Sequence, residues 1–560
     1  MSTVRRVFLY VLALVTLGIL SAGLINLLSL SFDAILSKFT IAQVGDLRQQ
    51  LSLGIAMVVI GGPLWFLFWS LIQRHAGRDA DESGSALRAF YLNFVLIVSA
   101  FVTVFTLYMF LAWLLTGLRA DQFSPGSTAT FIVAAAVWYY HLLISEKEGY
   151  HTQVARTVRR WYVYILSATG LIWLFIGIVQ IVNQAFVSLP VWQGDIVRAG
   201  FWNSATRGSL AGILTGGLTW GYFWFYAARD DVNSSLRQVY FYLLTILGSA
   251  IAGLTALIIT LYRTLYWFLG GDRDVANYFQ YLGWSIPTIL VAFFIWSYHL
   301  RVAGEESAVE RSQVSVRRVH YYLMSLLGLG TLIAGLIILL GIPLDSIINS
   351  LMQQTVVEEQ GWWNNRLSLS LAMLAVSIPI WLYYWTRIID MTEKDGADER
   401  RARSRRIYIY GIIGASVVML VADLVNIVYQ LLNGVLIGDL GIDVLRNMRW
   451  SLQTVFIAIP VLIYHLGIAG KDQKLGSENL AARKNVTVLV GDRKSPVIEL
   501  IEGKLGYKVR VSQYVGELPG AVPQLSGEDV DRLVSQIQAA AAGNVMLVLL
   551  ERNILVLPYK

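Results

Sequence analysis

Twelve long apolar segments constrain this sequence more than any other feature. In lipid, backbone amide and carbonyl groups must be satisfied within the segment, which favours helices. A helix needs about 20 apolar residues to cross the hydrocarbon core, whereas membrane-spanning strands are shorter and alternate in polarity. We therefore predict twelve transmembrane helices, at residues 7–31, 50–73, 89–117, 127–145, 161–189, 205–228, 239–269, 279–301, 319–350, 366–389, 407–437 and 448–469.

The composition supports a membrane location and excludes several kinds of chemistry. Of 560 residues, 56% are hydrophobic and 14% are charged, against about 25% charged in a soluble domain. The absence of cysteine excludes disulfides, thiolate catalysis and cysteine-ligated zinc or iron–sulfur clusters. The formal charge of +7 is attributed to cytoplasmic loops. We expect the lipid bilayer as a partner, no nucleic acid and no cofactor.

A basic and aromatic stretch opens every second apolar segment. The clearest is Arg-Arg-Ile-Tyr-Ile-Tyr at residues 405–410, and variants begin at residues 5, 87, 159, 237 and 317. Each opening starts a two-helix hairpin. Because the opening at Arg5 is one of six equivalents, the first segment is interpreted as a retained helix and not as a cleaved signal peptide.

The closing helices of these hairpins alternate between two patterns. Three of them carry a tryptophan pair at i, i+4, and the other three end with a histidine after aromatic residues. The pairs are Trp65/Trp69, Trp220/Trp224 and Trp381/Trp385, and the histidines are His141, His299 and His465. The alternation predicts an all-α polytopic membrane protein built from three four-helix repeats, at residues 1–158, 159–316 and 317–470.

The composition changes after Gly470, where a small soluble α/β domain is predicted over residues 480–560. Strands are expected at 486–490 and 507–512, and a hairpin at 545–550 and 554–557. Helices are expected from Pro496 and from about residue 527. This domain is predicted to be cytoplasmic and to offer a docking surface for other proteins.

The basic residues predict the orientation of the chain. The connections that lead from even-numbered to odd-numbered apolar segments hold more Lys and Arg than the connections on the other side. Cytoplasmic loops carry such an excess. Both termini are therefore predicted to lie in the cytoplasm, with the protein in the inner membrane of a bacterial cell.

The repeated Arg-Arg-x-Tyr-x-Tyr openings and the paired helices resemble an uncharacterised family of bacterial multipass membrane proteins, known only as a domain of unknown function. The resemblance covers about residues 4–470 and leaves the C-terminal domain outside. The second opening departs from the pattern, because Leu87 and Leu92 stand where other openings have Arg and Tyr. The resemblance implies a bacterial membrane protein and supplies no activity or site residues.

The arginines and tyrosines of the openings are interpreted as interfacial anchors, because both side chains suit the headgroup level. Specific recognition of a lipid or partner by the arginines is the alternative. The candidate anchors are Arg160, Arg318, Arg406, Tyr164, Tyr322 and Tyr410. Three histidines at equivalent places could also form a joint metal or titrating site. We expect separate interfacial anchors at His141, His299 and His465 instead, because no carboxylate in their motifs is placed to orient an imidazole.

A few polar residues fall within the apolar segments. Asp423 and Asn426 lie in one segment, and Asn183 and Gln184 in another. An acid at bilayer depth is a functional-site hypothesis, while a neutral Asp423 hydrogen-bonded to Asn426 is the alternative. The amides are more often used for helix–helix hydrogen bonds, and Gly212 and Gly216 have the spacing of a close helix contact.

Three classes of function compete on this evidence. A structural or assembly component that docks partners through the repeats and the C-terminal domain is preferred. The alternative is a transporter or channel with a polar site near Asp423 and the amides of residues 161–189. An enzyme ranks lowest, because apart from the three histidines no set of catalytic or metal-binding residues is visible.

Overall fold

The structure is a computed structural model of the whole chain. It describes residues 3–35, 44–78, 85–149, 153–192, 200–232, 234–270, 278–307, 314–351, 361–394, 399–400, 402–438, 440–482, 484–490, 496–505, 508–513, 527–540, 543–549 and 554–559. These residues form two compact units. The first comprises Met1–Thr386 and Leu440–Arg449, and the second comprises Arg387–Asp439 and Trp450–Lys560.

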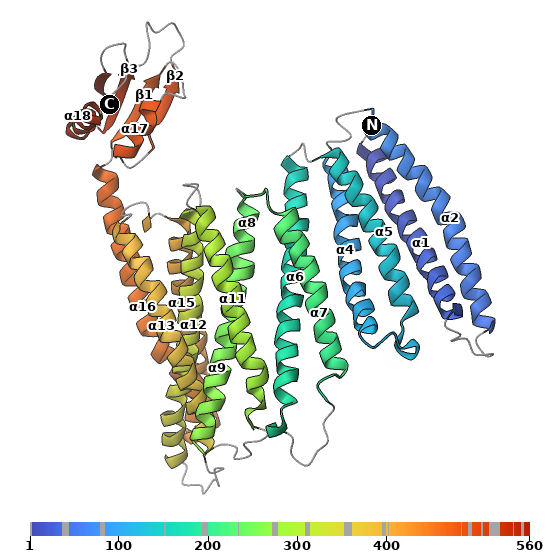
Figure 1. The fold of residues 1–560 in the computed structure, drawn as a ribbon. Coiled ribbons are helices and arrows are strands. Elements are labelled where there is room, and N and C mark those ends of the chain that lie inside the picture. Colours follow the sequence, from blue (N-terminus) through green and yellow to red (C-terminus); the bar gives the residue numbers. More distant parts are fainter. Residues whose placement is uncertain are drawn as a thin grey trace. The chain divides into compact units, whose positions relative to one another are not determined.

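The apolar segments are helical over most of their described residues, with short turns at the ends of four of them (Figure 1). The helices are α1 (Thr3–Ile35), α2 (Val44–Ala76), α4 (Ala86–Leu114), α5 (Pro125–Glu148), α6 (Gln153–Val187), α7 (Ser204–Trp220), α8 (Ser235–Val239), α9 (Gly248–Phe268), α11 (Leu282–Ser307), α12 (Val314–Leu351), α13 (Trp362–Lys394), α15 (Arg403–Ile437) and α16 (Ile442–Ala482). Short 3-10 turns are η2 (Ala120–Gln122), η3 (Pro190–Trp192) and η6 (Phe279–Tyr281).

Two π-helical segments interrupt the middle of the chain. One is η4 (Gly221–Ala227), which continues α7, and the other is η5 (Tyr240–Leu247), which joins α8 to α9. Among the described residues, eleven helices are long and apolar enough to cross a membrane. The predicted segment 205–228 is not one of them, because its α-helical part ends after 17 residues where η4 begins.

Neighbouring helices of the first unit pack as antiparallel hairpins. α1 packs on α2, α4 on α5, α6 on α7 and α9 on α11. In this unit the start of α4, α6 and α8 lies at the same end as the start of α1 (Figure 1). The division into three four-helix repeats stays a prediction.

Glycine lets α6 and α7 approach closely, as the spacing of Gly212 and Gly216 predicted. A Cβ atom at Gly216 would overlap the backbone nitrogen of Leu174, whereas the neighbouring Gly217 has room for one. On the facing helix, Gly170 lies against the backbone of Trp220 in the same way. The hairpin is thus held by backbone-to-backbone contact, which only small residues allow.

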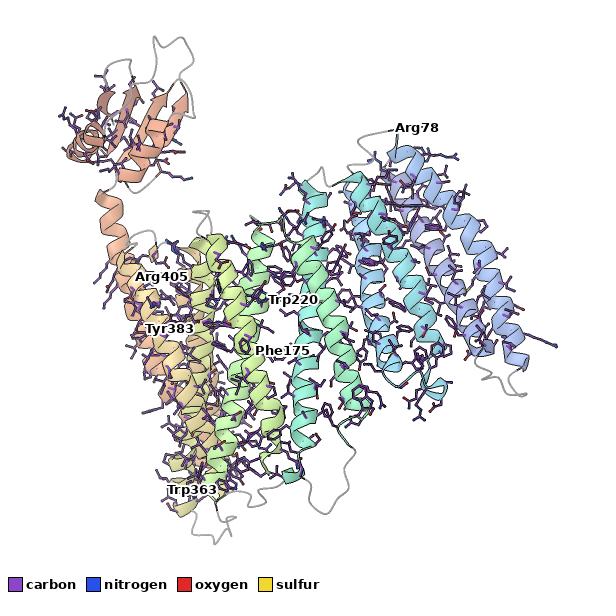
Figure 2. All side chains as sticks on the ribbon, in the orientation of Figure 1. Arg78, Phe175, Trp220, Trp363, Tyr383 and Arg405 are labelled. Atoms are coloured by element: carbon purple, nitrogen blue, oxygen red, sulfur yellow. The ribbon has the colours of Figure 1, made fainter. Side chains whose placement is uncertain are left out.

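One core of the first unit lies where α4, α6, η4, η5 and α11 meet and is rich in aromatic rings. Tyr162, Phe223, Trp224, Tyr240 and Phe241 are all buried in it. Aromatic pairs with edge-to-face and offset geometry add stability beyond the area they bury. Trp220, labelled in Figure 2, lies at the edge of this core at the junction of α7 and η4.

The second unit contains α15, most of α16, the end of α13 and a C-terminal α/β domain. Helix α15 ends at Ile437 and is capped by Gly438, whose φ of 78° is the left-handed conformation that glycine provides at a helix C-terminus. The domain consists of β1 (Asn485–Val490), α17 (Pro496–Leu505), β2 (Arg510–Gln513), α18 (Gly527–Ala539), β3 (Asn544–Leu549) and β4 (Ile554–Tyr559).

The four strands form one sheet in the order β2-β1-β3-β4. β1 pairs in parallel with β2 and β3, while β4 is antiparallel to β3 with Met546 opposite Leu557. Val488 and Leu547 face a core that also contains Ile501 of α17 and Ile537 of α18. Both helices therefore cover the same face of the sheet. The predicted turn of the hairpin, at residues 551–553, lies outside the described residues.

Candidate functional site

Among the described residues, an ion pair in which the arginine itself is buried occurs three times. The arginine Nε atom donates to the carboxylate at 2.8 Å for Arg88 and Glu148, at 2.9 Å for Arg237 and Glu306, and at 2.6 Å for Arg405 and Asp472. The three arginine side chains are only 1%, 7% and 5% exposed. Each pair joins the first turn of one helix to a carboxylate on a later helix: α4 to α5, α8 to α11 and α15 to α16.

The first two arginines are positioned by a capped helix start. Ser85 accepts a hydrogen bond from the backbone nitrogen of Arg88, and Ser234 does the same for Arg237. Such a cap satisfies a backbone donor that the helix leaves free. The third arginine, Arg405 (Figure 2), opens α15 and donates from Nη1 to the Thr392 hydroxyl at 2.7 Å.

The arginine of the middle pair makes further contacts with the backbone and with aromatic rings. The Arg237 guanidinium also donates to the Ala228 carbonyl at 2.6 Å, and it lies 4.7 Å from the Trp224 ring and 5.4 Å from the Phe241 ring. Cation–π contacts are strongest where water is excluded. The charge of Arg237 is therefore balanced by Glu306 and enclosed by aromatic rings.

A histidine lies seven residues before each carboxylate, on the same helix. In each one, Nδ1 is within 2.9 Å of the backbone carbonyl four residues earlier. Because a carbonyl only accepts, Nδ1 carries the proton and Nε2 of the neutral ring is an acceptor. Among the described residues, no donor reaches Nε2 of His141 or His299.

Aromatic rings surround these histidines. Around His299, the ring centroids of Trp224 and Tyr240 lie at 5.7 and 5.8 Å. The equivalent rings, Trp69 and Tyr91 around His141, lie at 5.6 and 6.1 Å. His465 has Tyr408 at 6.2 Å.

We call these three groups the Arg–His clusters. They consist of Trp69, Arg88, Tyr91, His141 and Glu148; Trp224, Arg237, Tyr240, His299 and Glu306; and Arg405, Tyr408, His465 and Asp472. The three histidines are 0%, 0% and 1% exposed. A lipid-facing anchor would expose its ring, so the interfacial interpretation does not account for them.

The described residues hold no group of three His, Asp or Glu side chains suited to a metal ion. Each histidine instead faces the aromatic rings of its own cluster. The clusters can hold neighbouring helices together through ion pairs, hydrogen bonds and the packing of aromatic rings.

The other candidate anchors lie in different environments. Tyr164 and Tyr322 are buried, while Arg406 and Tyr410 are exposed as an anchor requires. Arg160 is half-buried and pairs with Asp231 at 2.8 Å, and the Tyr164 hydroxyl donates to the same carboxylate at 2.8 Å. Arg318 is half-buried.

The candidate polar residues fall into different units. In the first unit the Gln184 carbonyl accepts a hydrogen bond from the Asn203 amide at 3.3 Å, and Asn183 lies against Gly283. In the second unit Asp423 and Asn426 are half-buried, and Oδ2 of Asp423 is buried with no hydrogen bond from the described residues. A site shared between the two units stays a prediction.

Sequence reasoning missed the carboxylates of the clusters, although a signal was present. Glu148, Glu306 and Asp472 each follow the histidine by seven residues, and a tyrosine follows each arginine by three. Seven residues are about two helical turns, so histidine and carboxylate share one helix face. This spacing repeats in all three clusters and would have linked them.

The middle cluster also differs from the others in its backbone. Trp224 lies in η4, and Tyr240 and Phe241 lie in η5, so two π-helical segments flank this cluster. Single-turn π segments within α-helices are frequent at functional sites. The equivalent residues Trp69 and Tyr91 lie in ordinary α-helix.

The length and composition of the helices place the chain in the class of multipass α-helical membrane proteins. The model of one family, described as a domain of unknown function (DUF5671), matches residues 6–140, 160–280 and 318–439. The chain belongs to this family, as the resemblance of its openings predicted. Each match begins at or next to an opening arginine, which fits an internal repeat. No curated protein and no solved structure matches significantly.

Proposed function

We propose that this protein is a non-enzymatic component of the bacterial inner membrane that supports or assembles other proteins. Twelve transmembrane helices would form three four-helix repeats, with both termini in the cytoplasm. The three family matches and the recurring ion pairs support the repeats. Because each buried guanidinium is neutralised by a carboxylate of another helix, the clusters suit a structural role better than a reaction.

The main support for a docking role is the apolar outer face of the C-terminal sheet. Residues opposite each other on paired strands share a face, so Met546, Val548, Leu555 and Leu557 lie together. They lie on the side opposite the core that α17 and α18 cover. Leu555 and Leu557 are 46% and 45% exposed, and Tyr559 on the same face is 38% exposed. A contiguous exposed apolar patch is typical of a protein-binding surface.

Co-purification after gentle detergent extraction tests this role. We expect the wild-type protein to retain one partner at fixed stoichiometry and Leu557→Glu to lose it, because a charge would be buried in the interface. Leu500→Glu is the matched control, since Leu500 is equally exposed but lies on α17 at the other side of the domain. If Leu557→Glu and Leu500→Glu retain the partner equally well, the outer face of the sheet is not the docking surface.

Asp423 favours transport as the second candidate function. Its carboxylate has a buried oxygen without a hydrogen bond from the described residues, within a helix apolar enough to span a membrane. An acid in that position is costly and often serves substrate or ion passage. Proteoliposome swelling with solutes of graded size tests this. Permeation that is lost in Asp423→Asn would favour the transporter over the assembly component.

A further inference from the structure

A cavity of about 370 Å³ lies in the first unit, outside the Arg–His clusters. It is formed by the end of α5, the first turns of α6, η4 and the residues that follow η4. Four arginines line it: Arg156, Arg159, Arg160 and Arg229. The carboxylates that line it are Glu146, Asp230 and Asp231. The described lining residues therefore carry a formal charge of +1.

The carboxylate of Asp231, which lines this cavity, is held by hydrogen bonds from three side chains. It accepts hydrogen bonds from Arg160, from the Tyr164 hydroxyl at 2.8 Å and from the Ser234 hydroxyl at 2.6 Å. A carboxylate with these partners is held in place and does not compete for the remaining cations. The pair of Arg160 and Asp231 thus forms a fixed part of the cavity lining.

The other cations of the cavity remain able to bind an anion. Arg229 and Asp230 form a 3.3 Å pair in which the side chains are 62% and 89% exposed, and exposed pairs of this kind contribute little. Arg156 and Arg159 come from the first turns of α6. A guanidinium has five N–H donors, so one that already has a partner can still donate to a ligand.

Aromatic rings form the remaining wall and lead out to the surface. Tyr162 and Phe223 are buried there, while Tyr226 is exposed and lies 5.3 Å from the Arg229 guanidinium. The cavity thus joins a basic pocket to an exposed aromatic surface at the end of a membrane-spanning helix. Basic pockets between transmembrane helices on the cytoplasmic side are places where lipid headgroups bind.

We propose that this cavity binds the phosphodiester group of a membrane phospholipid, with Arg156 and Arg159 as the principal donors. Arginine matches the geometry of phosphate oxygens, and a formal charge of +1 suits a single phosphodiester. Glu146 and Asp230 limit the positive charge, which disfavours ligands with several phosphates. The tyrosines would lie along the glycerol and the first methylene groups.

Native mass spectrometry of the full-length protein in detergent tests the proposal. The probes are phosphatidylglycerol, phosphatidylethanolamine, diacylglycerol and inorganic phosphate. We expect both phospholipids to bind and Arg156→Gln/Arg159→Gln to weaken them about tenfold, because two charged donors are lost. Arg119→Gln is the control, since Arg119 is an exposed arginine outside the cavity that pairs with Asp121. It should leave binding unchanged.

A second variant is expected to strengthen lipid binding. Glu146→Gln removes one carboxylate from the lining, so it should tighten phosphatidylglycerol about twofold by reduced repulsion. Glu146 is exposed, so the change leaves the helix bundle intact. Binding of diacylglycerol as tight as that of the phospholipids would overturn the proposal, as would binding that neither variant changes. Phosphate binding that is as tight as lipid binding would identify a site for the free ion instead.

Discussion

Removing Arg237 should destabilise the first unit by far more than removing a comparable surface arginine. Arg237→Met keeps much of the apolar stem but leaves Glu306 without its partner, and it removes one of the two donors to the Ala228 carbonyl, the other being the backbone N–H of Asp231. Breaking a buried pair on one side costs about 3–5 kcal/mol. Glu306 is 16% exposed, which places the expected loss toward the lower end of that range.

The matched control is the exposed pair of Arg301 and Glu305 on α11. Its side chains are 82% and 64% exposed and its atoms are 2.9 Å apart. A surface i,i+4 pair contributes about 0.5 kcal/mol or less. Arg301→Met should therefore leave the free energy of unfolding almost unchanged.

Unfolding in mixed micelles of increasing SDS content, followed by tryptophan fluorescence, measures both changes. The double variant Arg237→Met/Glu306→Leu should recover part of the loss, because no charge is then left buried without a partner. Equal losses for Arg237→Met and Arg301→Met would refute the reasoning. A double variant that shows only the sum of the single losses would show that the two side chains do not act as a pair.

Three further predictions follow from the helices and the connections between them. Gly216→Ala should disrupt the hairpin of α6 and α7 while Gly217→Ala is tolerated, because only the first would overlap backbone; yield of monodisperse protein checks this. If Asp423 is a neutral hydrogen-bonding group, Asp423→Asn should change the unfolding midpoint little, whereas a large drop would show that the charge itself is needed. The cysteine-free chain allows a single-cysteine test of orientation with an impermeant maleimide on intact cells. Arg119→Cys should be labelled and Asp230→Cys should not, and the reverse pattern would invert the topology.

The sequence predicted the positions of the helices well, because apolar length and the backbone requirement in lipid act on each segment alone. The segment 407–437, for example, corresponds to α15 at Arg403–Ile437. The strands and helices of the C-terminal domain were also predicted, since Val486-Thr487-Val488 and Pro496 are strong local signals. The π segments were not predicted, because a π-helix has no distinct apolar pattern.

The surroundings of the histidines could not be predicted in the same way. Aromatic neighbours such as Tyr140 and Tyr298 suit a bilayer interface, but they suit an aromatic enclosure equally well. In the structure these two hydroxyls accept hydrogen bonds from Trp69 and Trp224 at 2.7 and 2.9 Å. Which side of a helix meets a neighbour depends on packing between distant segments, and sequence periodicity alone does not fix it.

Site-specific photocrosslinking in living cells tests the proposed docking role most directly. A photoreactive amino acid is placed at Leu557 on the outer sheet face, or at Leu500 on α17 as the equally exposed control. The proposed role predicts one discrete adduct from position 557 and none from position 500. No adduct from position 557, or the same adducts from both positions, would contradict a docking function for this face.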